Sequence, residues 1–250
     1  MKKQVWLPCG LIAVLLVFWE FYVRLCQVPL YVLPAPSKVL SALFGDWSVL
    51  CSHGAVTVGE TMLGLAIAAV SGIVLAVLMD AWPLFKTAIY PLLVVSQTVP
   101  VIVLAPIFII YLGFGLAPKV LTVVLMCFFP IVVSFADGME QIDRNQINLV
   151  RAFGANRLQE YLLVKLPGAA PTLFSGLKVA ATYSISGAVV GEWLSSDKGL
   201  GYYMLRVKNA YMLDKVFACV LVVIVLSLLM NGFVKLIQFL STPYERRSGR

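Results

Sequence analysis

Charged side chains are scarce in this 250-residue chain: they make up 12% of its residues, whereas 61% are hydrophobic. So few charges cannot supply the polar surface that a soluble globule of this size needs. The apolar runs approach or exceed the length of about 20 residues that crosses a bilayer as a helix. The sequence therefore predicts an all-α integral membrane protein whose surroundings are a lipid bilayer.

Motifs for catalysis and nucleotide binding are also missing. The chain has no G-x-x-x-x-G-K-[ST] sequence, so it cannot hold nucleotide phosphates in the usual P-loop manner, and any ATP-driven work would have to come from another polypeptide. The single histidine, His53, has no obvious nucleophile or acid partner, and no residues show the spacing of metal ligands. We expect no catalytic residue, no metal and no cofactor.

The five cysteines form no C-x-x-C pair and lie mostly in or beside apolar runs, where thiols act as small apolar groups. Cys26 and Cys51 bracket a predicted external loop, so a disulfide between them stays open, although the spacing does not require one. The five are Cys9, Cys26, Cys51, Cys127 and Cys219.

Hydropathy predicts about six transmembrane helices in a single domain covering residues 1–250. The expected spans are residues 5–25, 55–79, 89–112, 119–136, 173–193 and 216–240. Lys2 and Lys3 before the first span, and the basic tail at 245–250, place both termini in the cytoplasm. The formal charge of +7 is attributed to this retention of Lys and Arg on the inner side, and no nucleic-acid partner is expected. The first run continues through Phe21 and Tyr22 without a small-x-small site, so we expect no signal-peptide cleavage.

Small residues recur at four-residue spacing along two of the spans. Such a stripe lets another helix backbone approach closely, so it indicates packing and not a binding site. The stripe of the fifth span could pack within the chain or across a homodimer axis. The two stripes are Gly64, Ala68, Gly72 and Ala76, and Gly176, Ala180, Ser184 and Ala188.

The outer segments carry two further features. Between the first two spans, prolines at 34 and 36 impose an extended entry, and Ser37 is expected to cap a short helix. Near the outer end of the fifth span, Glu192 is an acid at the membrane edge, so it is expected to bond a partner subunit or another protein outside the membrane, and is less suited to touching substrate.

The third span is interrupted by Pro91, Pro100 and Pro106. An interior proline frees a carbonyl group that a neighbour, a hydroxyl or water must satisfy. A loosened polar stretch near the bilayer midplane suits a solute pathway. We therefore place Ser96, Gln97, Thr98 and Pro100 on a translocation path. The alternative is that Gln97 and Thr98 simply bond to a neighbouring helix.

The stretch 148–167 is a polar, basic island in this apolar chain. Gly154 suits the left-handed residue that closes a helix running from about 139 to 153. Asn156 suits the next N-cap, with Gln159 completing a capping box. Pro167 is expected to end the second helix.

The second helix of this island is predicted to be amphipathic. Its apolar side can enter a groove on a partner, or the whole loop can lie on the membrane interface. The apolar side holds Leu158, Tyr161, Leu162 and Lys165, and the wet side holds Arg157, Gln159 and Glu160.

The same stretch resembles the EAA loop of permease subunits of ATP-binding cassette importers. That motif reads Glu-Ala-Ala, three residues, Gly, nine residues, an aliphatic residue, one more, then Leu-Pro. Gly154, Val164, Leu166 and Pro167 match it in spacing, whereas 148–150 read Asn-Leu-Val. The Gly-Phe-Gly turn at 113–115 and the Gly-Glu-Trp at 191–193 resemble the nitrate, sulfonate and taurine branch. The Gly-Glu-Trp motif together with the Gly-Leu-Gly-Tyr-Tyr-Met at 199–204 resembles, within this branch, the permeases linked to uptake of thiamine pyrimidine precursors.

The resemblance implies a permease subunit in the bacterial cytoplasmic membrane that works as a homodimer with two ATPase subunits and an external substrate-binding protein. The loop, about 138–170, would then form the coupling helix that docks into the ATPase. The coupling residues it implies are Arg151, Ala152, Phe153, Gly154, Ala155, Asn156, Arg157, Leu158, Tyr161, Leu162 and Pro167.

Two alternative functions predict different sequence features. A secondary transporter predicts ionisable residues near the midplane and often an inverted repeat. The sequence shows no inverted repeat. It also places no ionisable residue near the midplane, because Glu20 and Glu60 fall toward the outer ends of their spans. A scaffold without transport predicts neither a kinked polar span nor an amphipathic insertion. The solute stays open among nitrate, sulfonates, taurine, bicarbonate and pyrimidine precursors.

Overall fold

The computed structural model describes residues 3–242, apart from the side chains of residues 3–6, 8 and 9, and within this range it contains helices and no strand. The helices are α1 Lys3–Leu25, α2 Pro36–Gly45, α3 Trp47–Ala81, α4 Pro83–Ser96, α5 Val101–Leu112, α6 Leu116–Glu140, α7 Arg144–Ala152, α8 Arg157–Glu160, the π-helical turn η1 Tyr161–Lys165, α9 Leu166–Ser195, α10 Leu200–Asn209 and α11 Leu213–Ser241.

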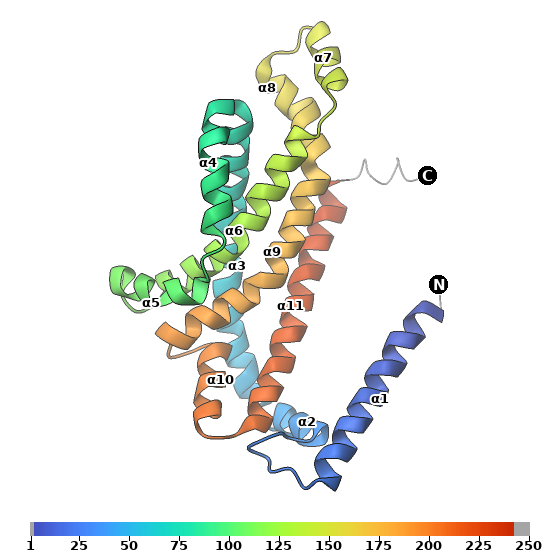
Figure 1. The fold of residues 1–250 in the computed structure, drawn as a ribbon, viewed down its shortest axis with the longest axis vertical. Coiled ribbons are helices and arrows are strands. Elements are labelled where there is room, and N and C mark those ends of the chain that lie inside the picture. The colour runs from blue at the N-terminus through green and yellow to red at the C-terminus, as the bar shows by residue number, and fades with distance from the viewer. Residues whose placement is uncertain (1–2, 243–250) are drawn as a thin grey trace.

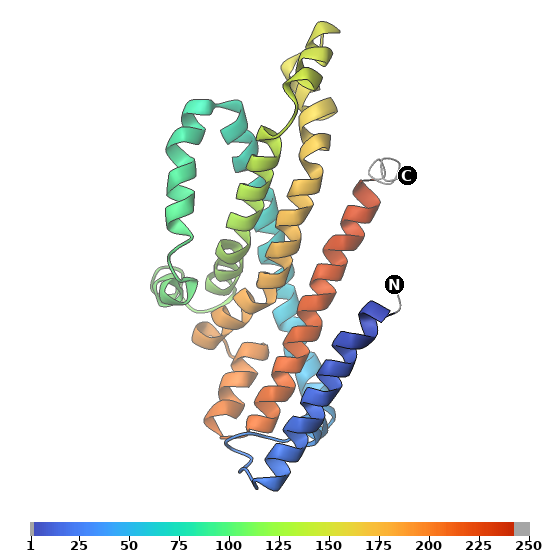
Figure 2. The same cartoon turned by 45° about the vertical axis from the view of Figure 1, so that its right-hand side comes forward.

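Three long helices, α3, α6 and α9, form the centre of the bundle, and α11 runs along α9 (Figure 1). The short helices α7 and α8 lie beyond one end of this bundle, which we call the arm end, and α2 and α10 lie at the opposite, far end. In both views α1 stands at the edge of the bundle, with its C-terminal end close to α2 (Figure 2). Trp19 of α1 meets Phe217 of α11 at 5.7 Å between ring centroids.

The small-residue stripes pack helices within this one chain. All eight stripe residues are buried. A Cβ added to Gly64 would lie 2.6 Å from Val123 of α6, and one added to Gly176 would lie 2.6 Å from the carbonyl oxygen of Pro130, also on α6. The fifth-span stripe therefore faces α6 and does not lie on a homodimer axis, because its residues are already covered by this chain.

The expected spans agree with the structure in outline. Four helices within the described residues are long and apolar enough to cross a membrane, and a bent pair makes a fifth. They are α3, α6, the continuous stretch 157–195, α11, and the pair α4 and α5. Helix α1 covers the first expected span with 23 residues. Lys2 and the basic tail, from which the cytoplasmic location of the termini was predicted, lie outside the described residues.

The third expected span is broken and not merely kinked. Helices α4 and α5 meet at 101°. Pro100 takes an extended conformation at the N-cap of α5, and its missing amide cannot continue the ladder of α4. Pro91 and Pro106 stay inside their helices, so only the proline beside the polar triplet at 96–98 separates the two halves.

Two local expectations were wrong, and the disulfide that the sequence left open does not form. The helix before Gly154 begins at Arg144, not near 139, because Asp143 interrupts the chain and caps α7 by accepting from the Asn145 amide at 2.8 Å. Ser37 does not cap α2, whose N-cap is Ala35; its hydroxyl donates to Glu20 at 2.8 Å instead. Cys26 and Cys51 are exposed free thiols and do not pair.

Gly64→Ala should destabilise the bundle by about 1–3 kcal/mol, since the new methyl group would overlap Val123 in a tightly packed seam. Gly59→Ala is the matched control on the same helix, because nothing lies within 4 Å of a Cβ there. Removing glycine from that open helical position should stabilise by about 1 kcal/mol. Thermal unfolding in detergent measures both; shifts of the same sign would contradict this packing.

Candidate docking arm and transmembrane cavity

The arm consists of residues 144–165, that is α7, the turn after it, α8 and η1, and it projects past the ends of α3 and α4 (Figure 1). Its turn has the predicted chemistry. Gly154 has φ of +82°, and the Gly154 and Ala155 amides donate to the Arg151 and Val150 carbonyls, which together form a Schellman motif. The capping box is confirmed: the Asn156 side chain accepts from the Gln159 amide at 2.9 Å, and the Gln159 side chain accepts from the Asn156 amide at 2.8 Å.

Large apolar side chains of the arm are exposed. Phe153, just before the glycine turn, is 84% exposed, and Leu158 is 67% exposed. Because soluble surfaces seldom present such a cluster on a polar helix pair, it indicates a surface that another protein or the membrane interface covers. The remaining members are Leu149, Leu162 and Leu163.

Beneath this surface lies a polar network that the sequence did not reveal. Glu160, expected to be wet, is buried and accepts from the Arg151 guanidinium at 2.8 Å. Tyr161 and Lys165 both donate to Asp80 at the arm end of α3, Lys165 at 2.6 Å. Asp80 was not singled out from the sequence, because its partners are 81 and 85 residues away.

Pro167 does not end the second helix, contrary to expectation. The chain passes from α8 through the π turn η1 into α9, and the helical stretch 157–195 is continuous. The Leu166 amide donates to the Tyr161 carbonyl, five residues back. A π turn shifts the hydrogen-bond register, so the proline at the second position of α9 is accommodated near the helix start, where its missing amide is tolerated.

A cavity of about 370 Å³ lies at the break between α4 and α5, against α6 and α9. Ser96 and Gln97 line it, whereas Thr98 and Pro100 do not, and the Thr98 hydroxyl donates back to the Val95 carbonyl at 2.7 Å. No charged side chain lines it. Its lining is Ser96, Gln97, Val99, Val101, Leu104, Leu125, Met126, Phe129, Pro130 and Tyr183. Two of the four predicted path residues are therefore at the cavity.

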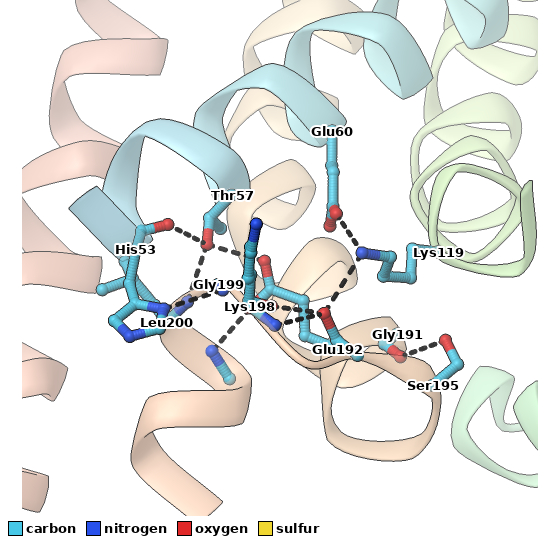
Figure 3. Close-up of polar contacts among 12 residues, drawn as sticks. His53, Thr57, Glu60, Lys119, Gly191, Glu192, Ser195, Lys198, Gly199 and Leu200 are labelled. Atoms are coloured by element: carbon cyan, nitrogen blue, oxygen red, sulfur yellow. Dashed lines mark hydrogen bonds and ion pairs between the residues drawn. The ribbon is translucent and has the colours of Figure 1, made fainter. Parts of the chain in front are cut away.

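The far end of the bundle holds a buried ionic cluster (Figure 3). Glu60 of α3 accepts from Lys119 of α6, and both are more than nine-tenths buried; Lys119 also donates to Ser196 at 3.1 Å. The sequence did not single out this pair, because the two residues are 59 positions apart.

Glu192 is 1% exposed and bonds within its own chain, so it does not reach out to a partner as expected. It accepts from the Thr57 hydroxyl at 2.7 Å and from the Gly201 amide at 2.5 Å (Figure 3). His53 Nδ1 accepts from the Gly199 amide at 3.0 Å. Together these contacts fix the start of α10 against α3.

Solved transporters share this fold. An amino acid ABC transporter aligns with a TM-score of 0.61 at 14% identity, covering 80% of this chain and 95% of that chain. The MetNI methionine ABC transporter, in an inward-facing conformation, aligns with a TM-score of 0.54 at 18% identity, covering 82% and 98%. The architecture is that of the membrane-spanning chain of an ABC transporter.

Sequence comparison then gives the family. Residues 68–239 match the binding-protein-dependent transport system inner membrane component. A probable ABC transporter permease protein of Haemophilus influenzae is 34% identical over 228 residues, covering 91% of this chain and 93% of the relative. The formylaminopyrimidine transport permease protein ThiX of Halalkalibacterium halodurans is 34% identical over 241 residues, covering 96% of each. The taurine transport system permease protein TauC of Escherichia coli is 28% identical, covering 98% and 93%. The chain belongs to the family of binding-protein-dependent transport system inner membrane components, and it is a permease subunit of an ABC importer.

Proposed function

We propose that two copies of this chain form the pore of a bacterial inner-membrane importer, with two ATPase subunits on the cytoplasmic side and a substrate-binding protein outside. The arm end and both termini would face the cytoplasm. The family name supports the external binding protein, and the lack of a P-loop in the sequence supports a separate ATPase.

The observation that carries this proposal is the exposed apolar surface on an arm that projects from the bundle. Residues 151–162 would insert into a groove on the ATPase, with Phe153 and Leu158 as the anchors because they are the most exposed. Tyr161 and Pro167 would support the arm without touching the ATPase, since Tyr161 bonds to Asp80 and Pro167 is the second residue of α9. When ATP closes the ATPase pair, the arms would move with it and open the cavity outward. Such coupling requires contacts that differ between the two states.

For the solute, we propose a pyrimidine of the thiamine-precursor class. ThiX is 34% identical to this chain, compared with 28% for TauC and 24% for the Synechocystis nitrate permease NrtB. The cavity favours the same choice: Phe129 and Tyr183 offer aromatic faces, Gln97 offers an amide, and no charged side chain lines it to pair with a sulfonate or nitrate. Taurine, sulfonates and nitrate would be the alternatives that an uptake assay distinguishes.

Gly154→Pro should reduce the amount of ATPase subunit that co-purifies with the chain at least about tenfold, or about 1.4 kcal/mol of association free energy. Proline fixes φ near −65°, whereas position 154 needs +82°, so the two halves of the arm would be misaligned. The measurement is co-purification of the detergent-solubilised chain with ATPase subunits encoded in the same genome.

Gly113→Pro is the matched control, because Gly113 is also a positive-φ helix-ending glycine with open space around it but lies away from the arm. It should keep the ATPase. If the wild type retains no ATPase, or Gly154→Pro retains as much as the control, the docking proposal is wrong. Ion-gradient-driven uptake would then be the next assay.

A further inference from the structure

Asp80 sits at the junction between the arm and α3. It is the next-to-last residue of α3, and its Oδ2 accepts from the Tyr161 hydroxyl and from Lys165 Nζ at 2.6 Å. The side chains of Asp80 and Lys165 are each only 14% exposed. Lys165 Nζ also lies 4.8 Å from the centre of the Tyr161 ring. Two donors from the arm therefore converge on one carboxylate of a different helix.

Tyr161 and Lys165 are four residues apart and so share one side of the helix, and the π turn brings Glu160 to that side as well. In an α-helix, residues five apart point to different sides because a turn takes 3.6 residues. In η1 the hydrogen bonds run five residues back, so side chains five apart come onto one side. Glu160 and Lys165 are five apart, and Lys165 Nζ lies 3.8 Å from Glu160 Oε1. Lys165 is thereby placed between the carboxylates of Glu160 and Asp80.

The network continues into the docking surface. The Arg151 guanidinium binds Glu160 Oε2 through Nε at 2.8 Å and through its terminal nitrogen at 2.7 Å. Arg151 is in the last turn of α7, two residues before the exposed Phe153. Charged groups thus form an unbroken series from α7, through Glu160 and Lys165, to Asp80 on α3.

Helix α3 leads from Asp80 to the rest of the transport machinery. After Ala81 the chain turns at Trp82 into α4, which ends at Ser96 beside the cavity and Gln97. In the other direction α3, which is 35 residues long, runs back to Trp47, and its Glu60, about 30 Å from Asp80 along the helix, is paired with Lys119. A displacement of Asp80 would therefore move both the cavity lining and the far end.

We propose that Asp80 is the positioning residue through which movement of the docking arm is passed to α3, α4 and the cavity. This inference rests on the proposed function, in which the arm docks on an ATPase. Tyr161 and Lys165 pull on Asp80 when the arm moves, and α3 and α4 follow because their backbones continue from it.

A static brace is the rival role for the same contacts. Asp80→Asn alone would leave Lys165 buried without its ion partner, and that could destabilise the arm. Asp80→Asn combined with Lys165→Met removes both charges, so no unpaired charge remains. A brace would tolerate this neutral pair, whereas a positioning role would not, because the ion pair between the two helices is lost and only the Tyr161 hydroxyl still ties them.

The test follows a thiol introduced by Gln97→Cys in the complex with its ATPase, reconstituted in proteoliposomes. Its labelling by a maleimide is measured with and without ATP plus vanadate, and peptide mass spectrometry reads position 97 separately from the native cysteines. With Asp80 intact, nucleotide should change the labelling rate at least about fivefold, the lower end of typical coupling between sites. Asp80→Asn and the neutral pair should reduce this response to less than about twofold while the ATPase still co-purifies. Asp80→Glu should restore most of it.

Glu140→Gln is the matched control, because Glu140 makes an ion pair of the same 2.6 Å length with Lys86 at the arm end but outside this network. It should keep the full response. If Asp80→Asn or the neutral pair responds like the control, Asp80 is a brace only and the inference is wrong while the proposed function stands. If the chain with intact Asp80 binds no ATPase or shows no nucleotide response, the proposed function fails, and the inference with it.

Discussion

Lys119→Met should destabilise the protein by about 3–5 kcal/mol, because it leaves the Glu60 carboxylate buried without its partner. Glu60 is 3% exposed and Lys119 7%. The second oxygen of Glu60 is buried and has no hydrogen-bond partner among the described residues. Thermal unfolding in detergent and the monodisperse fraction on size exclusion would report the loss.

Removing both charges separates the cost of the orphaned carboxylate from the value of the ion pair. Lys119→Met with Glu60→Leu should recover most of the lost stability, since replacing a buried pair by apolar groups is often neutral or stabilising. The matched surface control is Lys86→Met, whose partner Glu140 is 70% exposed; such pairs contribute about 0–1 kcal/mol. Equal effects of Lys119→Met and Lys86→Met would show that the far-end pair is not buried in the membrane-inserted protein.

Local rules were sufficient to predict the turn of the arm and the seams between helices. The left-handed Gly154 and the Asn156 capping box depend on residues within a few positions of each other, and the structure has both. The small-residue stripes follow from helical periodicity alone, and their burial is confirmed. A kink was predicted near Pro100, and in the structure the chain breaks there with an angle of 101° between α4 and α5.

Long-range pairing could not be predicted in the same way. Glu160 looked wet because a helix of its composition shows it on the polar side, but Arg151 and Lys165 surround it in the folded arm. Glu192 looked like a contact for another chain because its partner Thr57 is 135 residues away. The expected stop at Pro167 failed for a different reason: the π turn before it moves the proline to a helix start, where the local rule permits it.

Gln97→Trp should abolish solute uptake while the ATPase stays bound. Gln97 lines the cavity at the break between α4 and α5, and an indole there would occupy much of its 370 Å³. The side chain is exposed and not packed in the core, so folding should be unaffected. The assay is uptake of radiolabelled formylaminopyrimidine into proteoliposomes containing the chain, its ATPase and the binding protein, with taurine and nitrate as the competing candidates.

Thr98→Trp is the matched control, because Thr98 is also exposed but does not line the cavity. Uptake should survive that change, and Gln97→Asn should retain part of it. If Gln97→Trp transports as well as Thr98→Trp, the solute does not pass this cavity.

The result also separates passage of the solute through the cavity from the movement that nucleotide drives. A blocked cavity should leave the movement of α4 on nucleotide binding in place with no solute crossing, as measured at a thiol elsewhere on α4 because position 97 is then tryptophan. Loss of Asp80 should remove that movement itself. Both variants would import nothing, but only the first would still move.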